Sequence, residues 1–367
     1  MQYPLQPALK VLLSPLSAIY GAGVLLRNTF FKWGIFRGRE FPLPVISVGN
    51  ITVGGTGKTP HVEYLAALLR DKFNVAVLSR GYKRKTRGFA VVSTESHVEE
   101  VGDEPLQIKR KYPDVTVAVD GNRVRGIQKL CRCKGRIQAV LLDDAFQHRW
   151  VRPGISVLLT DYSRPLKDDM LLPAGSLREF VSAKERATTV IVTKCPPDIK
   201  PIERRIIMTD LKLFPWQSLF FTTFSYGDPR PVFSETVPFP EREIIRSEKY
   251  GILMVTGIVS PRPLRKHLRS ISPRIRQLRF PDHHRFGRKD VARIKDAWNS
   301  PGENLRMLIT TEKDAARLRQ TTGLDDELKR NMYYIPVSVK FIDGCGESFN
   351  KKIIDYVGKN KRDHILC

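Results

Sequence analysis

The chain has 367 residues and carries 62 Lys and Arg against 38 Asp and Glu, a formal net charge of +24. Its hydrophobic content of 41% can bury a substantial core, which excludes a disordered protein. Five cysteines are too few for a disulfide scaffold and are wrongly spaced for structural zinc, so reduced cytosolic thiols are expected. The basic excess indicates a polyanionic partner: nucleic acid, an anionic membrane surface or a phosphorylated substrate.

The N-terminal region, residues 1–40, contains an uncharged apolar stretch over 11–26 with basic residues on both sides. This stretch is shorter than the roughly 20 residues that a helix needs to span the hydrocarbon core, and Pro15 weakens a straight span. We therefore predict a helix in the membrane interface, with its aromatic side chains at headgroup level and its cations on anionic lipid. An ordinary buried helix is the alternative.

Residues 41–215 predict a doubly wound, mostly parallel α/β sheet. Short apolar, β-branched runs alternate with helical segments such as 61–70 and 123–130. The predicted strands are 44–48, 75–79, 115–119, 139–142, 156–160 and 189–193.

The rest of the chain predicts a second, smaller α/β domain behind a linker. Residues 216–250 are rich in Pro, Phe and Thr with few helical periods, which indicates an extended linker. The second domain is predicted at 251–345, and a C-terminal helix or tail at 346–367. Its expected strands are 252–256, 275–280 and 307–310, and its expected helices are 263–270 and 289–298.

The strongest chemical signal is a glycine-rich loop between the first predicted strand and the first helix. Against the pattern GxxxxGK[ST], the final Gly-Lys-Thr is intact, but Thr52 stands at the leading glycine position. In such a loop the backbone N–H groups bind phosphates, the lysine reaches the transferred phosphoryl group, and the threonine hydroxyl binds Mg²⁺. The predicted ATP-binding residues are Thr52, Val53, Gly54, Gly55, Thr56, Gly57, Lys58 and Thr59.

Two carboxylates, Asp143 and Asp144, follow the predicted strand at 139–142. A P-loop enzyme needs an acid at the end of a neighbouring strand to hold its metal ion. We therefore predict both acids as Mg²⁺ ligands beside Thr59. A helix cap and a solvated acid are the structural alternative.

These motifs resemble the tetraacyldisaccharide 4'-kinase family, the lipid A 4'-kinases of Gram-negative bacteria. The resemblance rests first on GNITVGGTGKTP at 49–60 and LDDAFQHR at 142–149, and it covers nearly the whole chain to about residue 340. Ala145 departs from the family's usual glycine, which matters if this residue needs a positive φ. Further family-like stretches are LSRGY at 78–82, VGDEP at 101–105, VDGNR at 119–123, LPAGSLRE at 172–179, FPDHH at 280–284 and TEKD at 311–314.

The resemblance implies transfer of the γ-phosphoryl group of ATP to the 4'-hydroxyl of a tetraacylated glucosamine disaccharide 1-phosphate, giving lipid IVA. It also implies a monotopic enzyme on the cytoplasmic face of the bacterial inner membrane. The phosphate loop, the apolar N-terminal stretch and the basic excess agree with it independently. The expected partners are the lipid A disaccharide 1-phosphate precursor and an anionic membrane surface, and no nucleic acid.

On the acceptor side, the resemblance implies a catalytic pair of Asp103 in VGDEP and His283 in FPDHH, with Lys58 as the third catalytic residue. An alcohol must lose its proton as the phosphoryl group arrives, so a carboxylate or histidine near it is chemically required. Glu179 is implied as a further Mg²⁺ ligand. Candidates for substrate or phosphate binding are Arg80, Tyr82, Glu104, Arg123, Gln147, His148 and Arg178, and any of them could instead form a structural ion pair.

Two other functions stay open from the residues alone. Residues 262–295 carry twelve Lys and Arg against two Asp, which suits a membrane-facing or substrate-facing surface or a solvated face. A nucleic-acid-stimulated P-loop ATPase is the main alternative, although it leaves FPDHH and LPAGSLRE without a role. A membrane-associated nucleotide-binding scaffold without turnover is the other.

Overall fold

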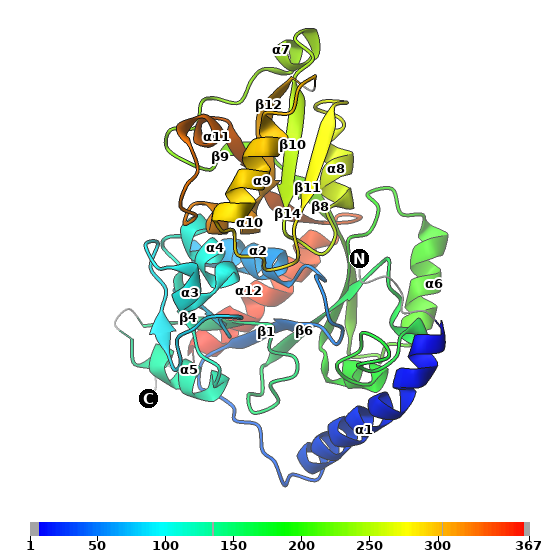
Figure 1. The fold of residues 1–367 in the computed structure, drawn as a ribbon. Coiled ribbons are helices and arrows are strands. Elements are labelled where there is room, and N and C mark those ends of the chain that lie inside the picture. Colours follow the sequence, from blue (N-terminus) through cyan, green and yellow to red (C-terminus); the bar gives the residue numbers. More distant parts are fainter. Residues whose placement is uncertain (1–6, 134–135, 303, 363–367) are drawn as a thin grey trace.

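The computed structural model describes residues 7–133, 136–302 and 304–362 and arranges them in two sheets with helices around each. In Figure 1 the larger sheet crosses the lower part of the view, and the smaller sheet stands above it. Helix α1 (Pro7–Lys32) lies along the outer side of the larger sheet. The predicted α/β fold class, with a second and smaller α/β unit, is confirmed.

The larger sheet has nine strands in the order β14-β8-β7-β6-β1-β5-β2-β4-β3 and is parallel except at its two edge pairs. Its central strands are buried on both faces, which explains their near-continuous apolar sequences. The six strands predicted for this sheet are present, each within one residue at either end. The bounds are β1 Val45–Gly49, β2 Val75–Ser79, β3 Ala90–Val91, β4 Thr116–Val119, β5 Ala139–Asp143, β6 Ile155–Asp161, β7 Thr189–Thr193, β8 Ser218–Tyr226 and β14 Val337–Phe341.

Helices cover both faces of the larger sheet. One face packs on α2 (Lys58–Arg70), α4 (Asp103–Lys111) and α12 (Gly346–Arg362), whose apolar side chains join the main core. The opposite face is covered by α5 (Arg123–Cys131) and by the segment that includes η2 (Val181–Arg186). The remaining elements of this unit are α3 Val98–Val101, η1 Leu166–Asp168 and α6 Pro201–Leu211.

The smaller sheet has five strands in the order β11-β10-β12-β13-β9, parallel except where β9 joins. One face buries a core against α9, α10 and α11, and the other face buries a core against α7 and α8. The strands are β9 Arg230–Pro231, β10 Gly251–Thr256, β11 Ile275–Arg279, β12 Leu305–Thr311 and β13 Met332–Ile335. The helices are α7 Arg242–Ser247, α8 Arg262–Leu268, α9 Arg288–Trp298, α10 Glu312–Leu318 and α11 Asp326–Arg330.

The extended linker predicted at 216–250 is wrong for its first part. Strand β8 pairs in parallel with β7, and β14, placed by the sequence in the second domain, pairs with β8 on its other side. Both strands therefore belong to the larger sheet, and the smaller sheet is inserted between them. The segment that leaves the larger sheet after β8 and the segment that returns to it before β14 lie side by side, where the Gly227 N–H donates to the Pro336 carbonyl at 3.0 Å. The β-branched and aromatic residues of β8 favour a strand, a signal that the neighbouring prolines obscured.

Helix α1 is longer than the apolar stretch that predicted it. Residues 8–32 have a mean hydropathy of 1.7 in their most apolar window, so the helix has the length and composition to cross a membrane. Only 17% of that window is buried, which contradicts the alternative of an ordinary buried helix. The helix touches the rest of the protein along one narrow strip, where Ser17 Oγ donates to the Leu171 carbonyl at 3.1 Å and Tyr20 donates to the Arg178 carbonyl at 2.8 Å.

Candidate active site

The phosphate loop joins β1 to α2, and its glycines are required by its shape. Helix α2 begins at Lys58, three residues earlier than predicted, directly after the loop. Gly54 and Gly57 have φ values of +104° and +88°, which disfavour any residue with a side chain. A Cβ on Gly57 would also lie 2.5 Å from the Phe224 ring. The loop thus presents its backbone and a helix N-terminus to a ligand, as phosphate binding requires.

Polar side chains outside the predicted ATP-binding residues 52–59 hold the loop in place. Asn50 donates to Thr56 Oγ1 at 2.9 Å and accepts from Lys58 Nζ at 3.4 Å. Two further cations lie at the loop: Lys194 donates to the Gly55 carbonyl, and Arg164 donates to the Val53 carbonyl at 3.4 Å. Sequence reasoning missed these cations because they come from the ends of other strands, far along the chain.

Asp143 and Asp144 lie at the carboxyl end of β5, beside the loop. Asp144 contacts Lys58 Nζ at 3.6 Å and accepts from Arg178 at 3.2 Å with both oxygens. Asp143 is buried, and burial together with the negative charges of Glu104 and Asp144 raises its pKa to about 7. Ser79 donates to one oxygen of Asp143 at 3.2 Å, while the other oxygen has no partner among the described residues.

These residues fit a Mg²⁺ ion in part. A buried carboxylate with an unpartnered oxygen and a second acid beside it are the hard oxygen donors that Mg²⁺ prefers. Glu179, the other predicted ligand, is buried and engaged elsewhere, with Arg27 at 3.3 Å and Arg186 at 2.9 Å. The structure does not group Glu179 with the two aspartates: across the described ranges, no cluster of three or more His, Cys, Asp or Glu has metal-binding geometry.

The predicted pair of Asp103 and His283 is formed across the two sheets. Asp103 is the first residue of α4 in the larger unit, and His283 follows β11 in the smaller unit. His283 Nδ1 lies 3.0 Å from Asp103 Oδ2, and the Tyr82 ring meets the imidazole edge-on at 4.9 Å between ring centres. His283 has a φ of +56°, a strained conformation of the kind that occurs at functional sites.

Two cations of α10 complete this group, and sequence reasoning assigned them no role. Lys313 Nζ lies 3.0 Å from His283 Nε2 and 3.2 Å from Glu104, and Arg317 forms an ion pair with Asp103. Because Lys313 can only donate, Nε2 accepts and the Nδ1–H of the imidazole donates to Asp103. The signal in the sequence was the i, i+4 spacing of Lys313, within TEKD, and Arg317, three residues after it, which places both cations on one helix face.

This group fixes the charge of Asp103. Burial opposes ionisation of the carboxyl, but the hydrogen bond from His283 and the charges of Lys313 and Arg317 hold its pKa well below the usual range. Arg317 is itself buried and pairs with Asp314 at 2.8 Å, which accepts the Gly257 N–H at 2.9 Å. The Asp103 carboxylate is therefore ionised and held by groups from both sheets.

The other predicted binding residues divide into three groups. Glu104 and Arg178 lie at the site, where Glu104 forms an ion pair with Lys313 and Arg178 forms one with Asp144. Arg123 and Gln147 bind backbone instead: Arg123 is buried and donates to the Asp120 and Asp143 carbonyls, and Gln147 donates to the Asn50 carbonyl. Arg80 is exposed, and Tyr82 is half exposed while its ring contacts His283. Burial lowers the pKa of His148 to about 4.

Ala145 does not need the glycine that the family usually has at its position. The residue with a left-handed backbone in this turn is Asp144, at a φ of +47°, and Ala145 is not among the residues with a positive φ. The substitution is therefore tolerated without backbone strain.

Comparison with known proteins decides the family. Residues 9–356 match the family model described as tetraacyldisaccharide-1-P 4'-kinase. The tetraacyldisaccharide 4'-kinases of Phocaeicola vulgatus and Bacteroides fragilis are each 48% identical to this chain, covering 96% of it and 96% and 95% of their own lengths. The chain belongs to the tetraacyldisaccharide 4'-kinase family.

A solved structure agrees with this family over almost the whole chain. The structure of LpxK from Aquifex aeolicus in complex with ATP has a TM-score of 0.71 and 29% identity, and covers 95% of this chain and 99% of its own. The protein is thus an ATP-binding kinase of lipid A biosynthesis, and the kinase prevails over the nucleic-acid-stimulated ATPase that the sequence left open.

Proposed function

We propose that the protein transfers the γ-phosphoryl group of ATP to the 4'-hydroxyl of a tetraacylated disaccharide 1-phosphate at the junction of its two sheets. The reaction, which forms lipid IVA, is the activity of its family. The observation that carries the location is the contact of Asp103 with His283 at 3.0 Å. Burial and the negative charge of Glu104, next to Asp103, raise the pKa of Asp143, which supports an acceptor side close to Asp143 and Asp144, the predicted Mg²⁺ ligands.

On the donor side, the loop backbone and the N-terminus of α2 bind the β- and γ-phosphates of ATP. Lys58 Nζ lies between Asn50 and Asp144 and neutralises the negative charge of the transferred phosphoryl group. Thr59, Asp143 and Asp144 would hold Mg²⁺, which when bound neutralises charge on the phosphates. The charges of Lys58 and Arg178 keep Asp144 ionised against the effect of burial, and the contact with Arg178 holds it in place.

On the acceptor side, Asp103 accepts the proton of the attacking hydroxyl. The transition state of phosphoryl transfer is largely dissociative, so the hydroxyl releases its proton late. The group that accepts this proton must therefore be ionised and correctly positioned, and it does not need to be a strong base. The ion pair with Arg317 and the hydrogen bond from His283 give Asp103 both properties.

The direct test is incubation of the full chain with [γ-³²P]ATP, Mg²⁺ and the tetraacyl disaccharide 1-phosphate in detergent. We expect label in the lipid fraction, and loss of the label after treatment with a phosphatase that acts on sugar phosphates. Consumption of ATP without label in the lipid would overturn the proposal.

We also propose that α1 attaches the protein to the anionic, cytoplasmic face of the inner membrane. Its exposed side chains include Leu12, Leu16 and Ile19, and the chain carries a net charge of +24. Deletion of residues 1–30 is expected to move the protein from the membrane pellet toward the soluble fraction. A remainder released by salt would reflect the basic surface at 262–295, because salt screens surface electrostatics. A truncated protein that stays membrane-bound in high salt would contradict the role of α1.

A further inference from the structure

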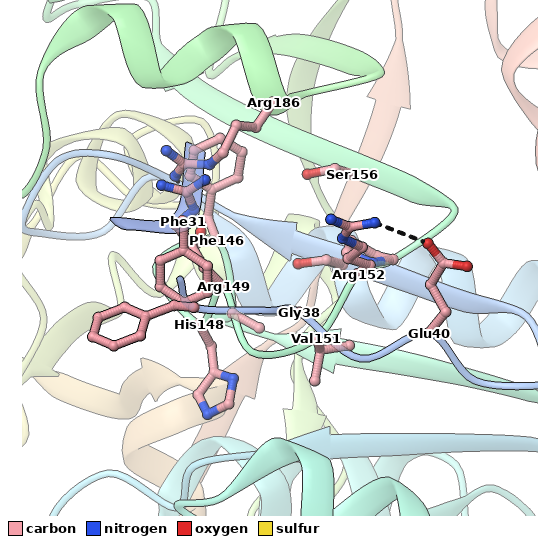
Figure 2. Close-up of a pocket in the computed structure, with 14 residues that line it drawn as sticks. Phe31, Gly38, Glu40, Phe146, His148, Arg149, Val151, Arg152, Ser156 and Arg186 are labelled. Carbon is pink, nitrogen blue, oxygen red and sulfur yellow. Dashed lines mark hydrogen bonds and ion pairs between the residues drawn. The ribbon is translucent and has the colours of Figure 1, made fainter. Parts of the chain in front are cut away.

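A cavity of about 350 Å³ lies where the end of α1 meets the loop that follows Asp143 and Asp144 (Figure 2). Phe31 and Phe36 bound it on the α1 side, the 145–153 loop bounds it on another, and Arg186 of η2 completes it. Among the described residues, none of those lining the cavity belongs to the phosphate loop or to the pair of Asp103 and His283. It is therefore a second concave site next to the catalytic one.

The floor of the cavity is polar. Ser47 of β1 and Ser156 of β6 are direct neighbours in the parallel register and both line the cavity. Ser47 is 2% exposed, and its hydroxyl has no hydrogen-bond partner within the described part of the chain. A buried hydroxyl without a partner is destabilising, so two adjacent serines at this position indicate a polar ligand.

The walls carry an excess of positive charge. Arg149 donates to Asn28 Oδ1 at 2.9 Å and lies over the Phe31 ring, and Arg186 lies over the Phe146 ring. Within the described residues, Glu179 is the one carboxylate that pairs with the group of Arg27, Arg149 and Arg186. Burial and the neighbouring Arg186 and Arg27 lower the pKa of Arg149 to about 10. The positive charge of this cluster is therefore not balanced by Glu179 alone, and the cluster can bind another anion.

Arg152 lines the cavity together with Arg149 and Arg186, and its guanidinium group is held by one weak ion pair. It pairs with Glu40 at 3.3 Å, as Figure 2 shows, but both side chains are more than 60% exposed. An exposed ion pair of this kind contributes little stability, so an incoming anion can replace it at small cost.

The cavity also lies at the level where α1 would leave a bilayer. Phe31, Phe36 and Trp150 form one aromatic cluster, with ring centres 5.1–5.4 Å apart. Trp33 is 71% exposed and Trp150 is 46% exposed, next to the basic end of the apolar helix. Aromatic side chains at the ends of apolar helices lie in the headgroup layer of a membrane. A ligand of the cavity would therefore come from the lipid headgroups.

We propose that this cavity binds a phosphate group carried by a lipid. Arg149, Arg152 and Arg186 supply the guanidinium groups, whose planar forks match phosphate oxygens, and the Ser47 and Ser156 hydroxyls donate from the floor. Two lipids carry such a group: the substrate, through its 1-phosphate, and an anionic phospholipid of the bilayer. The first source rests on the proposed function, whereas the second does not.

The binding test uses the full chain in neutral detergent, titrated with dihexanoyl phosphatidic acid below its micelle concentration and, separately, with inorganic phosphate. Ser47→Ala removes only an unpartnered hydroxyl and should fold normally, and Arg152→Ala removes an exposed side chain. Arg246→Ala, on exposed α7 of the smaller unit, is the matched control. For the phospholipid source we expect about fivefold weaker binding of phosphatidic acid in Ser47→Ala and about tenfold in Arg152→Ala. Equal binding of inorganic phosphate would overturn the assignment to a lipid.

The kinetic test separates the two sources. Each variant is assayed with the disaccharide 1-phosphate and with the same disaccharide lacking the 1-phosphate. A KM increased about tenfold by Arg152→Ala for the first substrate alone identifies the substrate's own 1-phosphate as the occupant. An unchanged KM with weakened phosphatidic acid binding identifies a bilayer phospholipid. If the variants change neither binding nor KM, the cavity is not a phosphate site. The binding test is informative even if the wild-type protein fails to phosphorylate the lipid, which would overturn the proposed function alone.

Discussion

The donor side and the acceptor side of the site are built in opposite ways. The donor side is local: the loop that follows β1 runs directly into Lys58 and Thr59, the first residues of α2, and the nearby acids lie at the end of one strand of the same sheet. The acceptor side joins Asp103 of the larger unit to His283, Lys313 and Arg317 of the smaller unit. A short motif fixes the first arrangement, whereas the second exists only when two separately folded units meet correctly. Catalysis should therefore tolerate changes at the interface less well than ATP binding does.

A large effect is expected on the donor side, from Lys58→Ala. Loss of a charge that stabilises the transferred phosphoryl group should lower kcat by about 10³-fold, as removal of a transition-state donor does elsewhere. The contacts of Lys58 with the described part of the chain are long, at 3.4 and 3.6 Å, so the fold should persist. The measurement is lipid phosphorylation, with circular dichroism to check folding and exposed Lys72→Ala as the control. Comparable activity in a folded Lys58→Ala variant would refute the donor assignment.

A smaller effect is expected at the interface, from Arg317→Leu. This change removes an ion pair of Asp103 and should lower kcat by about 10- to 100-fold while the KM for ATP changes little, since the phosphate loop is intact. The pKa of Asp103 should rise toward its ordinary value, so activity should be lost at a higher pH on the acid side. The pH profile of kcat measures this shift, with exposed Arg306→Ala as the control. An acid limb that stays in place would show that Arg317 does not act through Asp103.

The smallest effect concerns the stability of the donor side and its pH dependence. His61 of α2 is buried between the Gly57 carbonyl and Thr222 of β8, and burial lowers its pKa to about 4. Between pH 6.5 and 4 the unfolded chain binds a proton that the folded chain does not, so the free energy of unfolding falls as the pH falls. This group contributes at most about 1.4 kcal/mol per pH unit.

Urea unfolding across that pH range measures the contribution of His61. His61→Asn should flatten the slope by up to this amount, and the exposed His97→Asn is the control. An identical slope in the wild type and in His61→Asn would show that burial does not lower the pKa of His61 in the folded protein.

The same comparison shows what the sequence can reveal. The phosphate loop and the nearby carboxylates could be predicted because each is a run of neighbouring residues that directly follows a predicted strand. The pairing of β8 with β14 could not, because the two strands flank an inserted unit and local patterns carry no register between them. Lys313 and Arg317 were passed over because a cation's partner is not visible in the sequence. Arg123 was expected to bind phosphate, but it is buried and donates to two backbone carbonyls, because tertiary packing determines its partners.

The central claim is that Asp103 and His283 act as one unit across the two sheets. The most direct measurement is kcat for Asp103→Ala, His283→Ala and the double variant, with ATP affinity measured in each. Assistance by a general base is worth about 10²–10⁴-fold, so Asp103→Ala should lose activity of that order while ATP affinity changes little. Because residues that act as a unit are not additive, the double variant should lose far less than the product of the single losses. Losses that multiply, or near-normal turnover in Asp103→Ala, would contradict the account.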